Sequence, residues 1–316
     1  MIITPLCDLV GIRYPIFQGG MAHVSDATLA AAVSEAGGLG IISAMSRDGA
    51  YVRDQIHRAR ELTARPIGVN VMLMSPYVED VATVIAEEKV EVVTTGAGDP
   101  SKCMARWLDA GCKVIPVVAS AGLAKMMERQ GAHAVIAEGG ESGGHIGEMA
   151  TMPLVPQVVD AVSIPVIAAG GIGDGRGLAA ALMLGAVGVQ MGTRFLVAAE
   201  CPVHPHYKEL VLKAGDISTI VTGRRLGHPV RSLKTPYSRR YAKAEYTDID
   251  DETLEQMGVG ALRKGAVEGD EKDGCYLAGQ IAGLVKKEQS ASEILEEVMT
   301  EAEQCLLGAR GFIANR

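Results

Sequence analysis

The chain has 316 residues, of which 48% are hydrophobic and only 4% aromatic, and its formal net charge is −8. This length fits either two domains or one barrel of about 250 residues with an inserted segment. Few aromatic residues beside abundant Gly, Ala, Val, Ile and Met argue against an aromatic-rich β-sandwich, and the acidic charge argues against general nucleic-acid binding.

Short apolar runs alternate with amphipathic stretches over the first 200 residues. The expected strands are residues 15–18, 39–42, 67–71, 90–94, 114–118, 134–138, 166–169 and 187–191. The expected helices are 26–36, 50–62, 77–88, 101–110, 120–130, 154–161 and 175–184. Continuous Val/Ile runs indicate strands that are covered on both faces, and their regular spacing indicates right-handed βα crossovers. Eight such units predict an α/β fold that closes into a (β/α)₈ TIM barrel, in preference to an open doubly wound sheet.

The pattern changes after the eighth expected strand. Residues 201–268 are interrupted by Pro, Gly and charged residues, and a long helix is expected over 274–308. We therefore expect a barrel over 1–200, a small inserted subdomain that contacts nucleotide or substrate over 201–268, and a helical return over 269–316 that completes the barrel. The window 213–243 holds eight Lys or Arg and one acid, Asp216, a local charge of +7. It is expected either to attract anions or to be a solvated loop.

Cysteine usage and the N-terminus bear on where the protein works. The six cysteines are scattered without a CxxC pair or a Cys/His cluster, which predicts free thiols, no metal site and a reducing compartment. The N-terminus lacks the features of a signal peptide, and no apolar run approaches the ~18 residues of a membrane span. We therefore expect a cytoplasmic protein without a membrane segment.

Two glycine-rich stretches end consecutive expected strands. VIAAGGIG at 166–173 ends the seventh strand, and GVQMGTR at 188–194 ends the eighth. In a (β/α)₈ barrel the loops after these two strands commonly form a phosphate site from backbone N–H groups. A tight left-handed turn would explain either stretch alone, but the pair predicts a phosphorylated metabolite or cofactor.

Three more loops at the same end of the barrel carry candidate ligand groups. GGMA at 19–22 would let the backbone lie against a flat ring, with a tight βα turn as the alternative. Asn70 offers an amide that both donates and accepts, or that bonds its own loop. EGGESGGHIG at 138–147 places several glycines around one imidazole, His145, whose protonation changes near neutral pH.

These stretches resemble the flavin-dependent enoyl-acyl-carrier-protein reductases (enoyl-ACP reductase II), close relatives of the nitronate monooxygenases. The matching motifs are QGGMA at 18–22, GGLGII at 37–42, GVN at 68–70, SPYVED at 75–80, TTGAGDPSK at 94–102, AEGGESGGHIG at 137–147, IAAGGIGDG at 167–175, QMGTRF at 190–195 and GQIAGLV at 279–285. The monooxygenases share QGGM, the GGH loop and AAGGI. SPYVED, TTGAGDPSK and GQIAGLV favour the reductase, and Ser142 stands where Ala is expected.

The resemblance implies a TIM barrel that holds FMN at the carboxyl ends of its strands, in a homodimer. It places the flavin ring on Gly19, Gly20, Met21, Ala22 and Asn70, near Glu138, Ser142, Gly143 and Gly144. The ribityl chain would lie beside Gln190 and Met191, the phosphate on Gly170, Gly171, Gly192 and Thr193, and His145 would be catalytic. Further implied ligands are NADH, with NADPH as the alternative, a monovalent cation, and acyl carrier protein bearing an enoyl chain.

The implied reaction is the NADH-dependent reduction of trans-2-enoyl-acyl carrier protein, the last step of the fatty-acid elongation cycle. Hydride would pass from N5 of reduced FMN to the β carbon, with His145 either donating to the thioester oxygen or protonating the α carbon. Two other functions stay open: a nitronate monooxygenase that passes flavin electrons to oxygen, and a non-redox phosphate-binding barrel such as an isomerase, synthase or metabolite-binding protein.

Overall fold

Eight parallel strands close into a barrel within residues 1–312, which are the residues that the computed structural model describes. They pair in the order β1 (Ile16–Gln18), β2 (Leu39–Ser43), β3 (Ile67–Met72), β4 (Val92–Gly96), β5 (Lys113–Val118), β6 (Val135–Glu138), β8 (Val166–Ala169) and β9 (Gly188–Met191), with β9 pairing back to β1. Each expected strand overlaps one of these. The predicted (β/α)₈ barrel is therefore confirmed.

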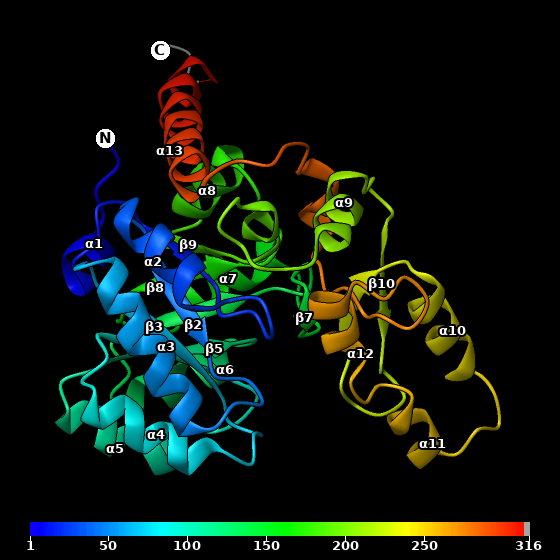
Figure 1. The fold of residues 1–316 in the computed structure, drawn as a ribbon. Coiled ribbons are helices and arrows are strands. Elements are labelled where there is room, and N and C mark those ends of the chain that lie inside the picture. The colour runs from blue at the N-terminus through cyan, green and yellow to red at the C-terminus, as the bar shows by residue number, and fades with distance from the viewer. Residues whose placement is uncertain (313–316) are drawn as a thin grey trace.

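Helices cover the outside of the barrel (Figure 1). They are α2 (Ala27–Glu35), α3 (Gly49–Leu62), α4 (Val78–Glu87), α5 (Ser101–Asp109), α6 (Ala121–Arg129), α7 (Thr151–Val159) and α8 (Gly175–Met183). Asp26, Ser120 and Asp174 begin α2, α6 and α8 by accepting hydrogen bonds from backbone N–H groups of the first turn. Such caps satisfy donors that have no partner inside the helix.

Neighbouring residues along a strand contribute to different cores. Phe17 and Val92 belong to a cluster inside the barrel, whereas Ile16 and Val93 pack outward against helices. This alternation follows from the two-residue period of a strand. Helix α1 (Pro5–Val10) adds the fully buried Leu6 to the inner cluster, so the barrel interior is filled by side chains and the ligand space lies above it.

The C-terminal segment differs from the expectation of one helix over 274–308. Residues 274–290 are largely irregular, with a short 3₁₀ helix, η3 (Gln280–Leu284), and α13 (Ala291–Gly308) begins only at Ala291 before the short η4 (Ala309–Phe312). A capping box of Ser290 and Glu293 starts α13. The irregular stretch passes tightly against the β6 loop, where a Cβ on Gly279 would lie 2.7 Å from the carbonyl oxygen of Glu141. The N–H of Gln280 donates to this same oxygen at 2.9 Å, and so bonds to the β6 loop and not to a helical partner.

A second, smaller lobe stands beside the barrel (Figure 1). Its elements are β10 (Thr219–Thr222), β11 (Val230–Leu233), α10 (Pro236–Ala244), α11 (Asp251–Gln256), α12 (Ala261–Arg263) and η2 (Lys264–Glu268). A separate cluster of Tyr237, Tyr241, Leu254 and Ala261 forms its core. By contrast, α9 (Pro205–Leu212) and η1 (Thr193–Val197) share the barrel core through side chains such as Tyr207 and Phe195. We propose that the inserted lobe begins after α9.

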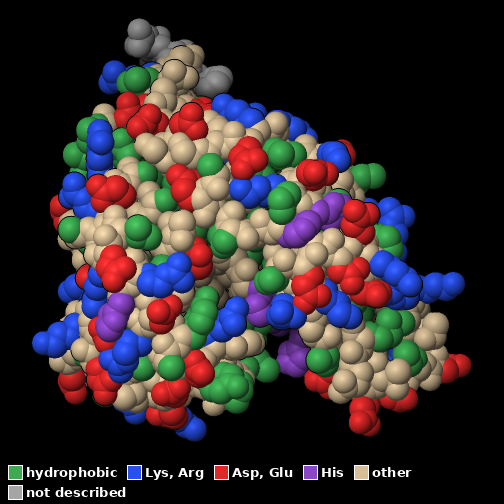
Figure 2. Space-filling model, viewed as in Figure 1, with side chains coloured by type: hydrophobic (Ala, Val, Ile, Leu, Met, Phe, Trp, Pro, Cys, Tyr) green, Lys and Arg blue, Asp and Glu red, His purple; other side chains and the backbone are tan. Residues whose placement is uncertain are grey.

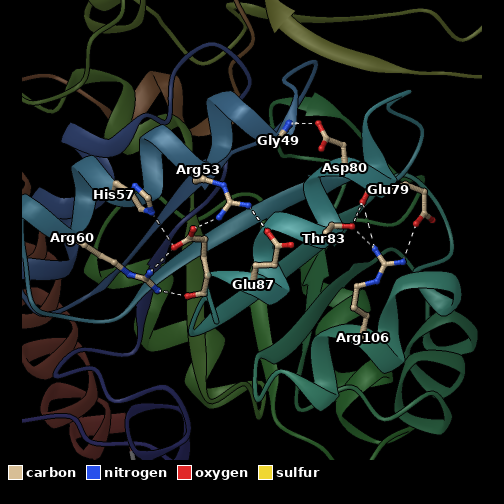
Figure 3. A network of polar contacts seen from close by, with 10 residues as sticks. Gly49, Arg53, His57, Arg60, Glu79, Asp80, Thr83, Glu87 and Arg106 are labelled. Carbon is tan, nitrogen blue, oxygen red and sulfur yellow. Dashed lines mark hydrogen bonds and ion pairs between the residues drawn. The ribbon is translucent and has the colours of Figure 1, made fainter.

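The outer surface of α3 and α4 carries a network of ion pairs (Figure 3). Glu88 lies 3.1 Å from His57 Nε2 and 3.4 Å from Arg60 Nη1, and Arg53 bridges it to Glu87. Burial acts to raise the pKa of Glu88, but hydrogen bonds from His57 and Arg53 outweigh burial, so this pKa is lowered from its ordinary value. The network ties two neighbouring helices together.

Replacing Glu88 with glutamine is expected to lower the free energy of unfolding by about 1 kcal/mol at pH 7. Since the folded-state pKa is lowered, the ionised carboxylate stabilises the fold above the unfolded-state pKa. This contribution is lost as the pH falls through the folded-state value. Urea unfolding at pH 7 and pH 3 measures both, with the more exposed Glu87→Gln as the matched control. An equal Glu88 effect at both pH values would contradict the assignment.

Candidate functional site

One cavity of about 1060 Å³ lies between the carboxyl ends of the barrel strands and the smaller lobe. Figure 2 shows the notch between the two lobes, with histidine, Lys and Arg side chains at its edge. Every residue assigned above to cofactor or catalysis lines this cavity. Their strands and loops are far apart in the sequence, so the barrel itself brings them together.

The β1 and β3 ends form one tightly packed wall. A Cβ on Gly20 would lie 2.3 Å from Cβ of Asn70, and a Cβ on Gly19 would lie 3.1 Å from Cδ of Gln190. Thr94 Oγ1 donates to Asn70 Oδ1 at 2.9 Å. Asn70 therefore does not bond its own loop, and its Nδ2 group, which has no acceptor among residues 1–312, is left to donate to a ligand.

Backbone N–H groups without protein partners mark the β8 and β9 ends. Gly170 and Gly171 have φ values of +84° and +71°, in a region that disfavours other residues. The N–H groups of Gly171, Ile172 and Thr193 find no acceptor among residues 1–312. The hydroxyl of Thr193 instead accepts the N–H of Gly279 at 2.9 Å, which fixes the C-terminal segment over this end. Unpaired donors on a glycine turn fit a phosphate.

The smaller lobe holds the loop that carries His145. Gly144–His145 forms a two-residue strand, β7, that pairs with β11, and the N–H of Ile146 donates to the carbonyl oxygen of Pro229 at 3.1 Å. From β11, Arg231 donates through Nε and Nη2 to the carbonyl oxygen of Gly140 at 3.1 and 2.9 Å. Strand pairing and the guanidinium together fix the position of the imidazole.

Burial changes the acid–base behaviour of two groups in this loop. His145 keeps an exposed surface, yet desolvation by the residues packed around it, with a smaller effect of neighbouring His228, lowers the pKa of its imidazole and favours the neutral form at pH 7. Burial raises the pKa of Glu138 to about 7, and nearby Ser142 opposes this shift. The buried Oγ of Ser142 nevertheless completes no hydrogen bond with the described residues. A polar ligand in the cavity would satisfy it.

Several lining residues were missed by the sequence analysis. Glu141 accepts hydrogen bonds from the N–H and hydroxyl of Thr151 at 2.9 and 2.8 Å, and so holds the β6 loop against α7. The smaller lobe and the segment after it contribute an apolar wall of Leu226, Val230, Tyr237, Tyr241, Cys275, Leu277 and Ile281. Only the GQIAGLV motif signalled this wall, because its other members have no regular spacing.

Four of the eight basic residues in the window 213–243 pair with acids outside it, the first of them Lys213 with Glu209 at 3.2 Å. Arg224 bonds Glu148 at 3.1 Å, Arg225 bonds Asp251 at 2.9 Å, and Arg240 bonds Asp273 at 2.5 Å. These pairs offset about half of the local charge of +7, and Lys234, Arg239 and Lys243 have no acidic partner within 4.0 Å among the described residues.

Residues 1–312 contain neither a cluster of metal ligands nor a helix able to span a membrane. No group of three or more His, Cys, Asp or Glu side chains there is arranged to hold a metal ion. None of the helices in this range has both the length and the hydrophobicity needed to cross a membrane.

Comparison with known proteins assigns the chain to a family. The model of the nitronate monooxygenase family matches residues 4–88 and 75–301. The structure of FabK from Thermotoga maritima has 50% sequence identity and a TM-score of 0.97, over 99% of this chain and 100% of that chain. From Mycobacterium tuberculosis, (3aS,4S,5R,7aS)-5-hydroxy-7a-methyl-1-oxo-octahydro-1H-indene-4-carboxyl-CoA dehydrogenase is 34% identical over 95% of this chain and 96% of its own.

A third similar protein, from Staphylococcus saprophyticus, bears the name Probable nitronate monooxygenase. It is 32% identical over 96% of this chain and 98% of its own length. These matches span nearly the whole chain, both lobes included. The chain belongs to the nitronate monooxygenase family of flavin-dependent oxidoreductases.

Proposed function

We propose that the protein is an FMN-containing, NADH-dependent reductase of trans-2-enoyl thioesters carried on acyl carrier protein. The observation that carries this proposal is the full-length similarity to FabK, an enoyl-acyl-carrier-protein reductase II, at 50% identity. The Mycobacterium tuberculosis relative has a carboxyl-CoA substrate by its name, which is also a thioester. A thioester substrate therefore agrees with two of the three similar proteins.

The cavity fits FMN together with a second ligand. Its volume of about 1060 Å³ reaches the upper end of ordinary small-molecule sites, about 300–1,000 Å³. We propose that Gly171 and Thr193 hold the phosphate through their free N–H groups, and that the ring lies over the wall of Gly20 and Asn70. FMN held by these residues would supply the hydride transfer that links NADH oxidation to reduction of the enoyl substrate.

His145 is proposed to act on the substrate carbonyl. The lowered pKa keeps the imidazole neutral, and a neutral imidazole still donates one N–H hydrogen bond. Negative charge that develops on a thioester oxygen during reduction is stabilised by a donor fixed in advance. Because β7 and Arg231 fix the loop, the donor is already in place when substrate enters.

Nitronate monooxygenase is the second candidate, supported by the family match and by the Staphylococcus relative. NADH consumption under argon with crotonyl-acyl carrier protein distinguishes the two. The proposal predicts NADH oxidation in step with loss of the enoyl group and no oxygen requirement. If NADH is stable under argon while an alkyl nitronate is oxidised in air, the reductase proposal fails.

Replacing Arg231 with methionine is expected to lower kcat for the enoyl thioester about 10-fold, with little change in FMN affinity. The variant removes the guanidinium that fixes the carbonyl of Gly140, and a small displacement of a catalytic group lowers the rate strongly. It removes no group on the proposed ring wall, so FMN affinity should change little. Steady-state kinetics and FMN titration measure the two quantities. Arg224→Met, which breaks only an exposed ion pair with Glu148, is the matched control. An equal loss in both variants would contradict a positioning role for Arg231.

A further inference from the structure

We infer that Arg47, His23 and Arg263 form a second phosphate site at the rim of the cavity. Its ligand would be the phosphate of the molecule that enters above the flavin: either the diphosphate of a nicotinamide dinucleotide or the phosphate of a phosphopantetheine arm. The choice of these two molecules as sources of the phosphate rests on the proposed function. The site itself rests on the arrangement of the three basic side chains.

Two of these groups meet on the barrel side. Arg47 Nη2 lies 3.5 Å from His23 Nδ1, and the Arg47 guanidinium stands 4.4 Å from the ring centroid of Tyr51. Tyr51 supports the guanidinium from one side, so its N–H groups other than the one directed at His23 are left to bind an anion. Both loops open into the cavity, because Ala22 and Met45 beside them line it.

The third group approaches from the smaller lobe. Arg263 ends α12, directly after Ala261 and Leu262, which line the opposite side of the cavity. Its positive charge acts on His23, together with that of Arg47, to lower the pKa of the imidazole, after the larger effect of burial. Arg263 therefore adds positive charge from the smaller lobe to the pair of His23 and Arg47 on the barrel, and none of the three belongs to the glycine turns after β8 and β9.

Arg47 forms no ion pair within residues 1–312. Asp26 and Asp48 accept backbone N–H groups at the starts of α2 and α3, and no carboxylate of the described residues lies within 4.0 Å of the Arg47 guanidinium. Arg263 pairs with Glu268, but their side chains are 62% and 44% exposed, and exposed pairs are weak. A phosphate would replace that partner without a large loss.

The backbone supports the same inference. His23 and Ser46 have φ values of +58° and +56°, a conformation that non-glycine residues adopt at a cost of about 1–2 kcal/mol. These residues lie in the two loops that bring His23 and Arg47 together. Strained residues of this kind persist where the surrounding structure fixes them, and they cluster at ligand sites.

Isothermal titration of the FMN-loaded protein tests the site with ADP-ribose, 4′-phosphopantetheine and pantetheine. Arg47→Gln and Arg263→Ala are each expected to weaken one phosphate ligand about 10-fold or more, without changing the affinity for pantetheine. Arg58→Ala, an exposed α3 arginine that pairs with Asp54, is the control and is expected to bind like the wild type. Glutamine at position 47 retains packing against Tyr51, so folding is preserved.

The two phosphate probes separate the sources. Weaker ADP-ribose binding assigns the site to the dinucleotide, and weaker phosphopantetheine binding assigns it to the substrate arm. Wild-type affinity for both probes in both variants, or no binding of either probe to the wild type, overturns the inference. The titration measures binding and not turnover. A loss of affinity in Arg47→Gln would therefore support the phosphate site even if the enoyl thioester is not a substrate. Turnover of the enoyl thioester by the wild type would likewise support the proposed function even if neither variant changes phosphate binding.

Discussion

Replacing His145 with alanine is expected to lower kcat for the enoyl thioester by about 10²–10³-fold, because it removes a fixed donor from the developing negative charge. FMN content should stay at the wild-type level, since His145 lies on the β6 loop and not at the glycine turns after β8 and β9. Anaerobic turnover and flavin absorbance measure the two quantities. His57→Ala, on the outer surface of α3, is the control.

A second substitution separates the two proposed roles of His145. Glutamine keeps an N–H donor but does not transfer a proton at neutral pH, so His145→Gln should recover part of the lost rate if the imidazole stabilises the thioester oxygen. No recovery would assign His145 as the proton source. Wild-type kcat in His145→Ala, with FMN bound, would remove the residue from the mechanism.

The barrel was predictable because its signals are local and repeated. Runs such as the one that forms β3 (Ile67–Met72) are short, apolar and regularly spaced, and closure follows from repeating one βα unit. The glycine turns were predictable for the same reason, since Gly170 and Gly171 follow a clear strand. The resemblance to a known family supplied the rest of the cavity wall, including Asn70 and Gln190.

The smaller lobe was not predictable in the same way. Strand β7 has two residues, Gly144–His145, and exists because β11 pairs with it from more than eighty residues away. No local pattern encodes such a partner. Arg231 was likewise one of many basic residues in its window, and only the fold shows that its guanidinium reaches the carbonyl of Gly140.

The prediction of one helix over 274–308 was wrong for a similar reason, because contacts with residues far away in the sequence decide the structure of this segment. Leu277 and Ile281 are apolar at helical spacing, yet both line the cavity from an irregular segment. Both side chains lie between the cavity and the β6 loop, and neither packs as part of the apolar face of an α-helix. At Gly171 the two requirements fall on one residue: the turn needs a positive φ, and the proposed phosphate site needs the backbone N–H of that residue.

Replacing Gly171 with alanine is expected to weaken FMN binding about 30-fold, and Gly111→Ala is the matched control. Both glycines have a positive φ, +71° and +86°, so alanine strains either turn by about 1–2 kcal/mol. A Cβ meets only ordinary contacts at Gly171 and open space at Gly111. Gly111 lies between α5 and β5, at the other end of the barrel.

The two variants should therefore lose similar stability without FMN, but only Gly171→Ala should lose affinity. A strained turn at Gly171 misplaces a charge-assisted hydrogen bond to phosphate, worth about 2 kcal/mol, which corresponds to about 30-fold in Kd. FMN titration of the apoprotein and urea unfolding measure the two quantities. Equal FMN affinity in both variants would contradict the placement of the phosphate at the β8 turn, because backbone strain alone would then account for every effect of Gly171→Ala.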